Sequence, residues 1–187
     1  MGSVGYFVIY GLTGLVVVFL LVRAALAARA YIKFRGQRLV TCPENAKPAA
    51  VDVDAKRAGA EALVGTPHLR LSECSRWPEK RDCGQWCLKQ IELAPEGCLV
   101  RSIVTNWYEG KKCAICGRLI HEVEWMGHKP ALLDPAHKTV YWDTVPAERL
   151  PEYFTTHAPI CWDCHVAQTL RREHPELVTE RPWRWGS

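Results

Sequence analysis

The sequence predicts an α+β protein that has one N-terminal transmembrane helix followed by a small cysteine-rich domain. Three observations lead to this fold class. Residues 6–22 form a long run without charge, nine cysteines lie beyond it, and the chain after residue 113 mixes strand-like and helix-like stretches around proline turns. With 187 residues, 48% apolar and 24% charged, the composition is that of a folded protein rather than a disordered one.

The first predicted element is the apolar run YFVIYGLTGLVVVFLLV at residues 6–22. Apolar residues continue beyond Arg23, whose side chain can snorkel toward water, so the run has the length of a single transmembrane helix. A secretory signal peptide would place basic residues before a shorter apolar core, and no Lys or Arg precedes this run. We therefore expect residues 1–38 to form an uncleaved transmembrane helix with a basic extension that ends near Gly36.

The basic residues beside this helix predict its orientation. All of them follow the apolar run: Arg23, Arg29, Lys33, Arg35 and Arg38. Because cytoplasmic flanks carry the excess of Lys and Arg, we expect the N-terminus outside and the cysteine-rich domain in the cytoplasm, with these side chains at membrane lipid headgroups. The net charge of +4 comes mostly from this cluster, so it does not indicate a nucleic-acid partner.

The next two segments precede the clearest motifs. We expect residues 39–67 to be partly a linker, with a short strand at most around Val51 and Val53 and one or two helical turns after it. Residues 68–112 are predicted to be a helical cysteine-rich segment in two pieces. The first piece places Cys83, Trp86, Cys87 and Ile91 on one face, and the second places Val100, Ile103, Val104 and Trp107 on one face.

Residues 113–175 are predicted to form a module of short strands and one helix. Strands are expected over residues 118–125 and 138–145, with proline turns between them. The helix is expected to begin near Cys161 and to end before Pro175. Residues 176–187 are expected to form a tail that holds RPWRWGS, which is either unstructured or contacts the membrane interface or a partner.

Two CxxC pairs carry the clearest chemistry: Cys113 with Cys116, followed by Gly117, and Cys161 with Cys164. Two thiolates at this spacing can face one metal ion if the backbone turns tightly, and glycine permits the left-handed conformation that the turn requires. The second pair opens a predicted helix, whose N-terminal amide groups stabilise thiolate charge. The pairs together predict a zinc ion bound by four cysteines.

Residues 113–175 resemble the treble-clef zinc fingers. The order of features is the same: a zinc knuckle (Cys113 to Gly117), a hairpin, and a CxxC pair at the start of a helix. Within that group the pattern is most similar to HNH nucleases, in which CxxCG is followed by a strand histidine and then by CxxCH; His128 and His165 stand at those positions. The resemblance implies a zinc-stabilised hairpin and helix. It also implies, as one alternative, a degenerate tethered nuclease that acts through His128.

The stretch CWDCH has a second interpretation as a c-type haem attachment site, with Cys161 and Cys164 as thioether links and His165 as an axial ligand. Met126 or one of the other histidines could supply the sixth ligand. Attachment normally takes place on the outer side of the membrane, and haem would leave Cys113 and Cys116 without a purpose. In the zinc interpretation His165 only caps or packs.

Four further cysteines lie within one short segment: Cys74, Cys83, Cys87 and Cys98. They could bind a second metal ion or an iron–sulfur cluster, with Cys42 as a fifth candidate, or they could be buried thiols or disulfides. In a reducing compartment such a density of cysteine favours metal ligation over disulfides.

We expect no catalytic residues. The predicted function is that of a membrane-anchored accessory or scaffold subunit, which binds a protein partner through exposed aromatic residues and is held by structural zinc. The alternative from another class is electron transfer through haem or an iron–sulfur cluster.

Overall fold

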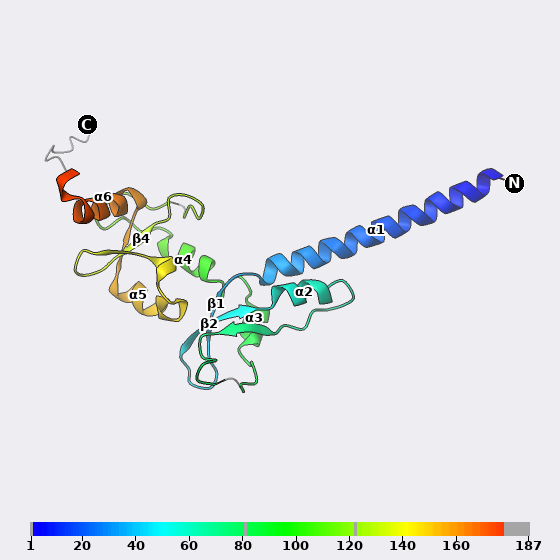
Figure 1. Ribbon diagram of the computed structural model, residues 1–187, viewed down its shortest axis with the longest axis horizontal. Helices are drawn as coiled ribbons and strands as arrows, with labels where there is room; N and C mark the ends of the chain where they lie inside the picture. The colour runs from blue at the N-terminus through cyan, green and yellow to red at the C-terminus, as the bar shows by residue number, and fades with distance from the viewer. Residues whose placement is uncertain (1, 81, 122, 178–187) are drawn as a thin grey trace. The chain divides into compact units, whose positions relative to one another are not determined.

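The computed structural model describes residues 2–80, 82–121 and 123–177, and the side chains of residues 6–177 within them. The chain divides into two compact units, one ending at Val100 and one beginning at Arg101. Both units combine helices with a small antiparallel sheet (Figure 1), which confirms the expected mixture of helix and sheet. Residues 178–187, most of the predicted tail, lie outside the described residues.

A single long helix, α1 (Gly2–Phe34), opens the first unit. From Tyr6 onward it is long and apolar enough to cross a membrane. Residues 6–22 are exposed all round, whereas Arg23, Ala27, Ala30 and Phe34 are partly or fully buried. These four positions recur at helical spacing, so only the part of α1 from Arg23 onward packs against the rest of the unit.

The helix α2 (Ala55–Glu61) packs along this C-terminal part of α1. Asp54 caps it, because the side-chain Oδ1 accepts a hydrogen bond from the Arg57 amide at 2.9 Å. A methyl group at Gly59 would lie 3.2 Å from the Ala27 carbonyl oxygen and 3.3 Å from Tyr31 Cβ. The two helices can therefore approach this closely because residue 59 is glycine.

Three antiparallel strands form the sheet of the first unit in the order β1 (Arg38–Thr41), β2 (Pro48–Val53) and β3 (Leu71–Cys74). Val51 and Val53 are buried while Asp52 between them is only half-buried, as a strand with one covered face requires. Residues 39–67, expected to be partly a linker, thus supply β2 and α2 to the folded unit. The expected short strand and helical turns within that segment are confirmed.

Arg38 is the largest fully buried side chain of the first unit, with none of its surface exposed. Its guanidinium donates hydrogen bonds at 2.6 Å to the carbonyl oxygens of Lys33 and Pro95. The expectation that Arg38 lies with the other basic residues at lipid headgroups is therefore wrong. A charge can be buried here because two backbone carbonyls, one from the end of α1, accept its protons.

The helix predicted to start at Cys83 begins only at α3 (Leu88–Leu93). Gln85 has a φ of +51°, and its side-chain oxygen accepts a hydrogen bond from the Leu71 amide at 3.1 Å. These features hold the preceding residues out of the helix, so Cys83 and Cys87 do not share a helix face. Cys74 ends β3, in a segment that we expected to be helical.

The second unit opens with helix α4 (Val100–Tyr108), which was predicted at this place. Its sheet has the order β5 (Thr139–Tyr141), β4 (Ala131–Leu133) and β6 (Ala158–Ile160), all antiparallel. All three residues of β4 are buried at the centre of this sheet. The remaining elements are η1 (Trp142–Thr144), η2 (Ala147–Arg149), α5 (Leu150–Thr156), α6 (Trp162–Glu173) and η3 (Pro175–Leu177).

The strand predicted over residues 118–125 is wrong for the residues described there, which form only one isolated bridge, between Lys112 and Leu119. The central strand instead uses Ala131–Leu133, where three consecutive apolar residues can be covered on both faces. The strand predicted over residues 138–145 is confirmed in its first part as β5. The helix predicted from Cys161 is confirmed as α6.

Candidate metal centre

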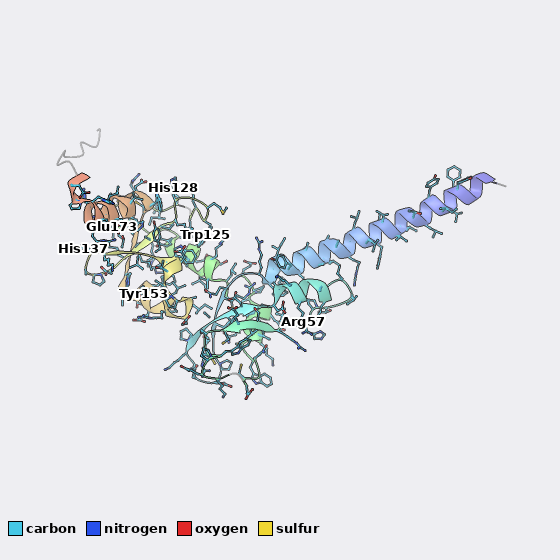
Figure 2. The ribbon with its side chains drawn as sticks, viewed as in Figure 1. Arg57, Trp125, His128, His137, Tyr153 and Glu173 are labelled. Atoms are coloured by element: carbon cyan, nitrogen blue, oxygen red, sulfur yellow. The ribbon has the colours of Figure 1, made fainter. Side chains whose placement is uncertain are left out.

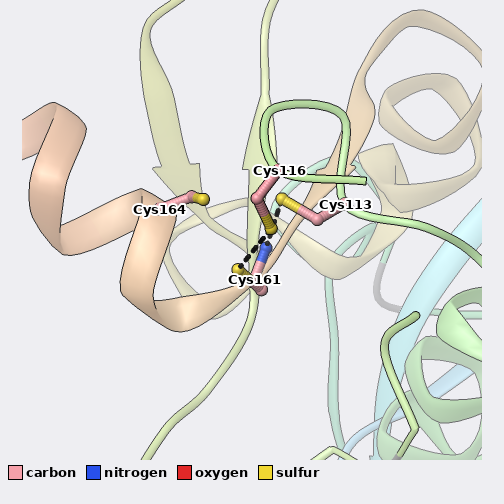
Figure 3. Close-up of side chains that lie close together, drawn as sticks. All are labelled: Cys113, Cys116, Cys161 and Cys164. Atoms are coloured by element: carbon pink, nitrogen blue, oxygen red, sulfur yellow. Dashed lines mark hydrogen bonds between the residues drawn. The ribbon is translucent and has the colours of Figure 1, made fainter. Parts of the chain in front are cut away.

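Four cysteine thiols of the second unit converge on one point (Figure 3). The Sγ atoms of Cys113, Cys116, Cys161 and Cys164 all lie within 4.8 Å of one another, and Cys116 Sγ lies 3.8 Å from Cys161 Sγ. A tetrahedral ion with metal–sulfur bonds of about 2.3 Å places its sulfur ligands about 3.8 Å apart. The cluster therefore has the dimensions of a site for a metal ion such as zinc.

The first pair of thiols is presented by a tight turn. The Cys113 amide donates to the Arg118 carbonyl at 2.8 Å, and the Gly117 amide donates to the Cys113 carbonyl at 2.9 Å. Gly117 has a φ of +71°, the left-handed conformation predicted for it. These bonds fold the backbone so that the two Sγ atoms of the pair lie close together, as Figure 3 shows.

The second pair is presented by the start of α6. Strand β6 leads directly into Cys161, which is the N-cap of α6, and Cys164 lies on its first turn. Unpaired amide groups and the positive end of the helix dipole favour thiolate at these positions. The helix also gives the two side chains a fixed spacing.

Backbone hydrogen bonds connect the two halves of the site. The Ala114 amide donates to the Pro159 carbonyl at 2.8 Å, and the Cys161 amide donates to Cys113 Sγ at 3.4 Å. The turn is thereby attached to β6 and to the N-terminus of α6 through the backbone. The positions of all four thiols consequently follow from the packing of one turn on one strand and helix.

Arg118 provides positive charge next to the thiols. Burial raises the pKa of Cys116, but hydrogen bonds from Arg118, Cys164 and Cys113 together lower this pKa to about 6. Burial raises the pKa of Cys161 and of Cys164, and neighbouring thiols raise that of Cys164 further. Thiolates packed this closely repel one another, and a bound divalent cation would offset that repulsion.

The cysteines of CWDCH are turned toward Cys113 and Cys116, and His165 is turned into the core. The His165 side chain is only 4% exposed, and its ring lies edge-on to Tyr141 with centroids 4.2 Å apart. Burial lowers its pKa, as expected for a neutral packed imidazole. An axial haem ligand needs an imidazole nitrogen open to the iron, so this geometry favours a metal ion over haem.

His128, the counterpart of the nuclease histidine, lies outside the thiol cluster, near the start of α6 (Figure 2). Its Nδ1 is 3.3 Å from Glu124 Oε2, and both side chains are about two-thirds exposed. The two residues line an open pocket of about 350 Å³ together with Trp162 and Asp163. Met126, the suggested sixth haem ligand, is 98% exposed.

Of the four cysteines that we considered for a second metal site, the structure brings only three together. Cys74, Cys83 and Cys87 line one pocket of the first unit, but Cys98 is not among the residues lining it. Its Sγ instead lies 3.6 Å from the Gln90 carbonyl oxygen. The fourth thiol in that pocket belongs to Cys42, which we considered only as a fifth candidate.

Comparisons with known proteins add no relative: no family model, curated protein or solved structure matches the chain.

Proposed function

We propose that this chain is a single-pass membrane protein whose cytoplasmic part is stabilised by zinc and acts as a non-catalytic accessory or scaffold subunit. The observation that carries the proposal is the convergence of four thiols within 4.8 Å, together with one helix that is long and apolar enough to span a membrane. A soft, four-sulfur tetrahedral ligand set selects zinc or iron.

Four protein ligands support a structural rather than a catalytic zinc. A catalytic zinc normally keeps one position for water or substrate, whereas four thiolates leave none. The ligands come from two distant segments, so metal binding contributes directly to the folding of the unit. A turn with a CxxC pair, a short sheet and a helix that starts with a second CxxC are also the parts of a treble clef, which supports the same assignment.

The packing of α1 supports the proposed membrane boundary. Residues 2–22 of this helix extend about 30 Å at about 1.5 Å per residue, which matches a hydrocarbon core of about 30 Å. From Arg23 onward the helix is covered by α2, and Arg23 Nε donates a hydrogen bond to the Leu63 carbonyl. The lipid-exposed part of α1 therefore ends where the folded unit begins. Arg29, Lys33 and Arg35 remain as the basic flank that predicts a cytoplasmic side.

Exposed apolar side chains support a binding role. Met126 is 98% exposed, Leu93 is 87% exposed and Trp86 is 64% exposed, all outside α1. Large apolar groups of this kind are enriched where proteins bind partners. We propose a protein partner in a membrane or cytoplasmic complex, and no nucleic acid.

A second candidate function follows from the same four sulfurs. They could hold iron, which would make the unit an electron carrier. Haem at Cys161 and Cys164 is the weaker form of this alternative, because His165 is packed against Tyr141.

Elemental analysis of the purified full chain in detergent tests the metal, and a topology reporter fused after Ser187 tests the orientation. We expect a colourless protein that contains zinc, a Cys116→Ser variant that lacks about one zinc ion per chain, and a cytoplasmic reporter. The matched control is Cys98→Ser, which removes a thiol outside the cluster. A coloured protein with iron or a Soret band would overturn the zinc assignment, and an external reporter would overturn the topology.

The accessory role needs a separate measurement. In native gels of solubilised membranes, the chain should migrate in a complex larger than its own mass of 21.2 kDa with bound detergent. Met126→Asp places a charge at an apolar side chain that is 98% exposed, and it should reduce that complex if the proposed surface binds the partner. Migration of the wild type at its own size would contradict the role.

A further inference from the structure

The turn after β1 has the same backbone hydrogen bonds as the turn that presents Cys113. The Cys42 amide donates to the Lys47 carbonyl at 2.9 Å, and the Ala46 amide donates to the Cys42 carbonyl at 2.9 Å. In the Cys113 turn the same two bonds join residues at the same separations, 113 to 118 and 117 to 113. Ala46 has a φ of +55°, in the place that Gly117 occupies with +71°. The backbone of the Cys42 turn therefore has the same conformation as the turn that carries the first CxxC pair.

One position differs between the two turns. Asn45 stands where the Cys113 turn has Cys116. Its side-chain oxygen accepts a hydrogen bond from the Lys47 amide at 3.0 Å, just as Cys116 accepts one from the Arg118 backbone. The amide side chain thus supports the turn without supplying a thiolate. This knuckle can contribute one sulfur ligand, and any further ligands must come from elsewhere in the unit.

Three other cysteines lie around the same pocket as Cys42. Cys74 is the last residue of β3, Cys87 is the N-cap of α3, and Cys83 lies in the segment between them. All three line the same pocket as Cys42, which has a volume of about 30 Å³. A cysteine at a helix N-cap also occurs in the first site, where Cys161 precedes α6. Cys87 therefore reaches its pocket from the start of a helix, as Cys161 reaches the first cluster.

Arginine accompanies the thiols in both places. Arg76 follows Cys74 by two residues, and its Nη1 lies 2.7 Å from Cys42 Sγ. Arg118 follows Cys116 by two residues and lowers the pKa of that thiol. Burial, together with the neighbouring Cys74 and Cys83, raises the pKa of Cys87 to about 11. A divalent cation would remove that repulsion.

We propose that Cys42, Cys74, Cys83 and Cys87 bind a second zinc ion, and that Cys98 does not take part. The Sγ atoms of these four cysteines lie farther apart than those of the first cluster. Binding of the ion draws them together and releases their protons to solvent. The described residues between Cys74 and Leu88 form neither helix nor strand, so the ion would attach this segment to the β1–β2 hairpin. A small unit with few regular elements gains stability from such a cross-link.

Chelator-dependent alkylation of the wild-type chain in detergent tests the proposal without any substitution. Iodoacetamide is applied before and after metal removal, and the modified cysteines are mapped by mass spectrometry. We expect Cys42, Cys74, Cys83 and Cys87 to react only after the chelator is added, whereas Cys98 reacts at the same rate in both conditions. Equal rates for the four with and without chelator would overturn the site. A mass deficit from disulfides among them would overturn it as well.

Zinc counting in matched variants gives a second readout. Wild type should hold about two zinc ions per chain, Cys42→Ser about one, and Cys98→Ser about two. A Cys42→Ser protein with the wild-type zinc content would contradict the proposal, and iron in place of zinc would contradict the choice of metal. Failure of the first site is recognised separately, because the alkylation map reports Cys113, Cys116, Cys161 and Cys164 on their own.

Discussion

Arg118 Nη2 donates a hydrogen bond to Asp163 Oδ2 at 2.7 Å, which joins the turn that carries Cys116 to the helix that carries Cys164. The two residues stand beside opposite halves of the metal centre. Arg118 also lowers the pKa of Cys116. Arg118 is therefore a positioning residue: it fixes the two cysteine pairs relative to each other, and it favours the thiolate form of Cys116.

Replacing Arg118 by Gln should weaken metal binding about tenfold, because groups that orient metal ligands typically contribute a factor of 10 or more. Competition with a chromophoric chelator measures this affinity. The matched control is Arg149→Gln, which removes an exposed arginine from its pair with Glu152 on the same unit. Equal affinities of the two variants would show that the Arg118 contact has no influence on the site.

Metal affinity should depend on pH in a way that identifies Cys116. Cys161 and Cys164 have raised pKa values, so metal must displace their protons at neutral pH, whereas the pKa of Cys116 is about 6. As pH falls through about 6, Cys116 also becomes protonated, and the slope of log affinity against pH should steepen by about one proton. In Arg118→Gln this pKa rises, so the steepening should move to higher pH. An unchanged profile would contradict the assignment.

Gly117→Ala should separate backbone strain from crowding. A Cβ at this position would meet nothing within 4 Å, so the cost arises only from the φ of +71° and should be about 1 kcal/mol. We expect zinc affinity to fall about fivefold, the equivalent of that cost. Gly110→Ala is the matched control, since Gly110 has a φ of +70° and an equally open Cβ position. It should lose similar thermal stability and keep its zinc affinity.

Arg38→Met should destabilise the first unit by about 2–4 kcal/mol, because the buried guanidinium and its two hydrogen bonds to the carbonyls of Lys33 and Pro95 would be lost. Arg38→Lys should lose less, since an ammonium can still donate to one carbonyl. Denaturant unfolding followed by tryptophan fluorescence measures both variants. Arg35→Met, at an exposed neighbouring position, serves as the control. Similar stabilities for Arg38→Met and Arg35→Met would contradict the structural role of Arg38.

The first metal centre could be predicted from the sequence because its information is local. The CxxC spacing identifies each pair as a set of metal ligands. Gly117 predicts the tight turn after the first pair, and the residue pattern after Cys161 predicts a helix. The pairing of the two halves needed only one further assumption, a shared ion.

Other parts could not be predicted, because they depend on contacts far apart in the chain. The burial of Arg38 requires the carbonyl of Pro95, which no local pattern reveals. Strand β4 has three buried residues and no alternation, so it carries no strand period. Cys42 carries no local metal-binding signal, because Asn45 stands where a second cysteine would complete a CxxC pair.

Zinc K-edge X-ray absorption on the purified full chain tests the central claim most directly. A tetrathiolate site predicts a first shell of sulfur alone, at about 2.3 Å from the metal. A shell that contains nitrogen or oxygen at about 2.0 Å, or a metal edge that belongs to iron, would contradict the account.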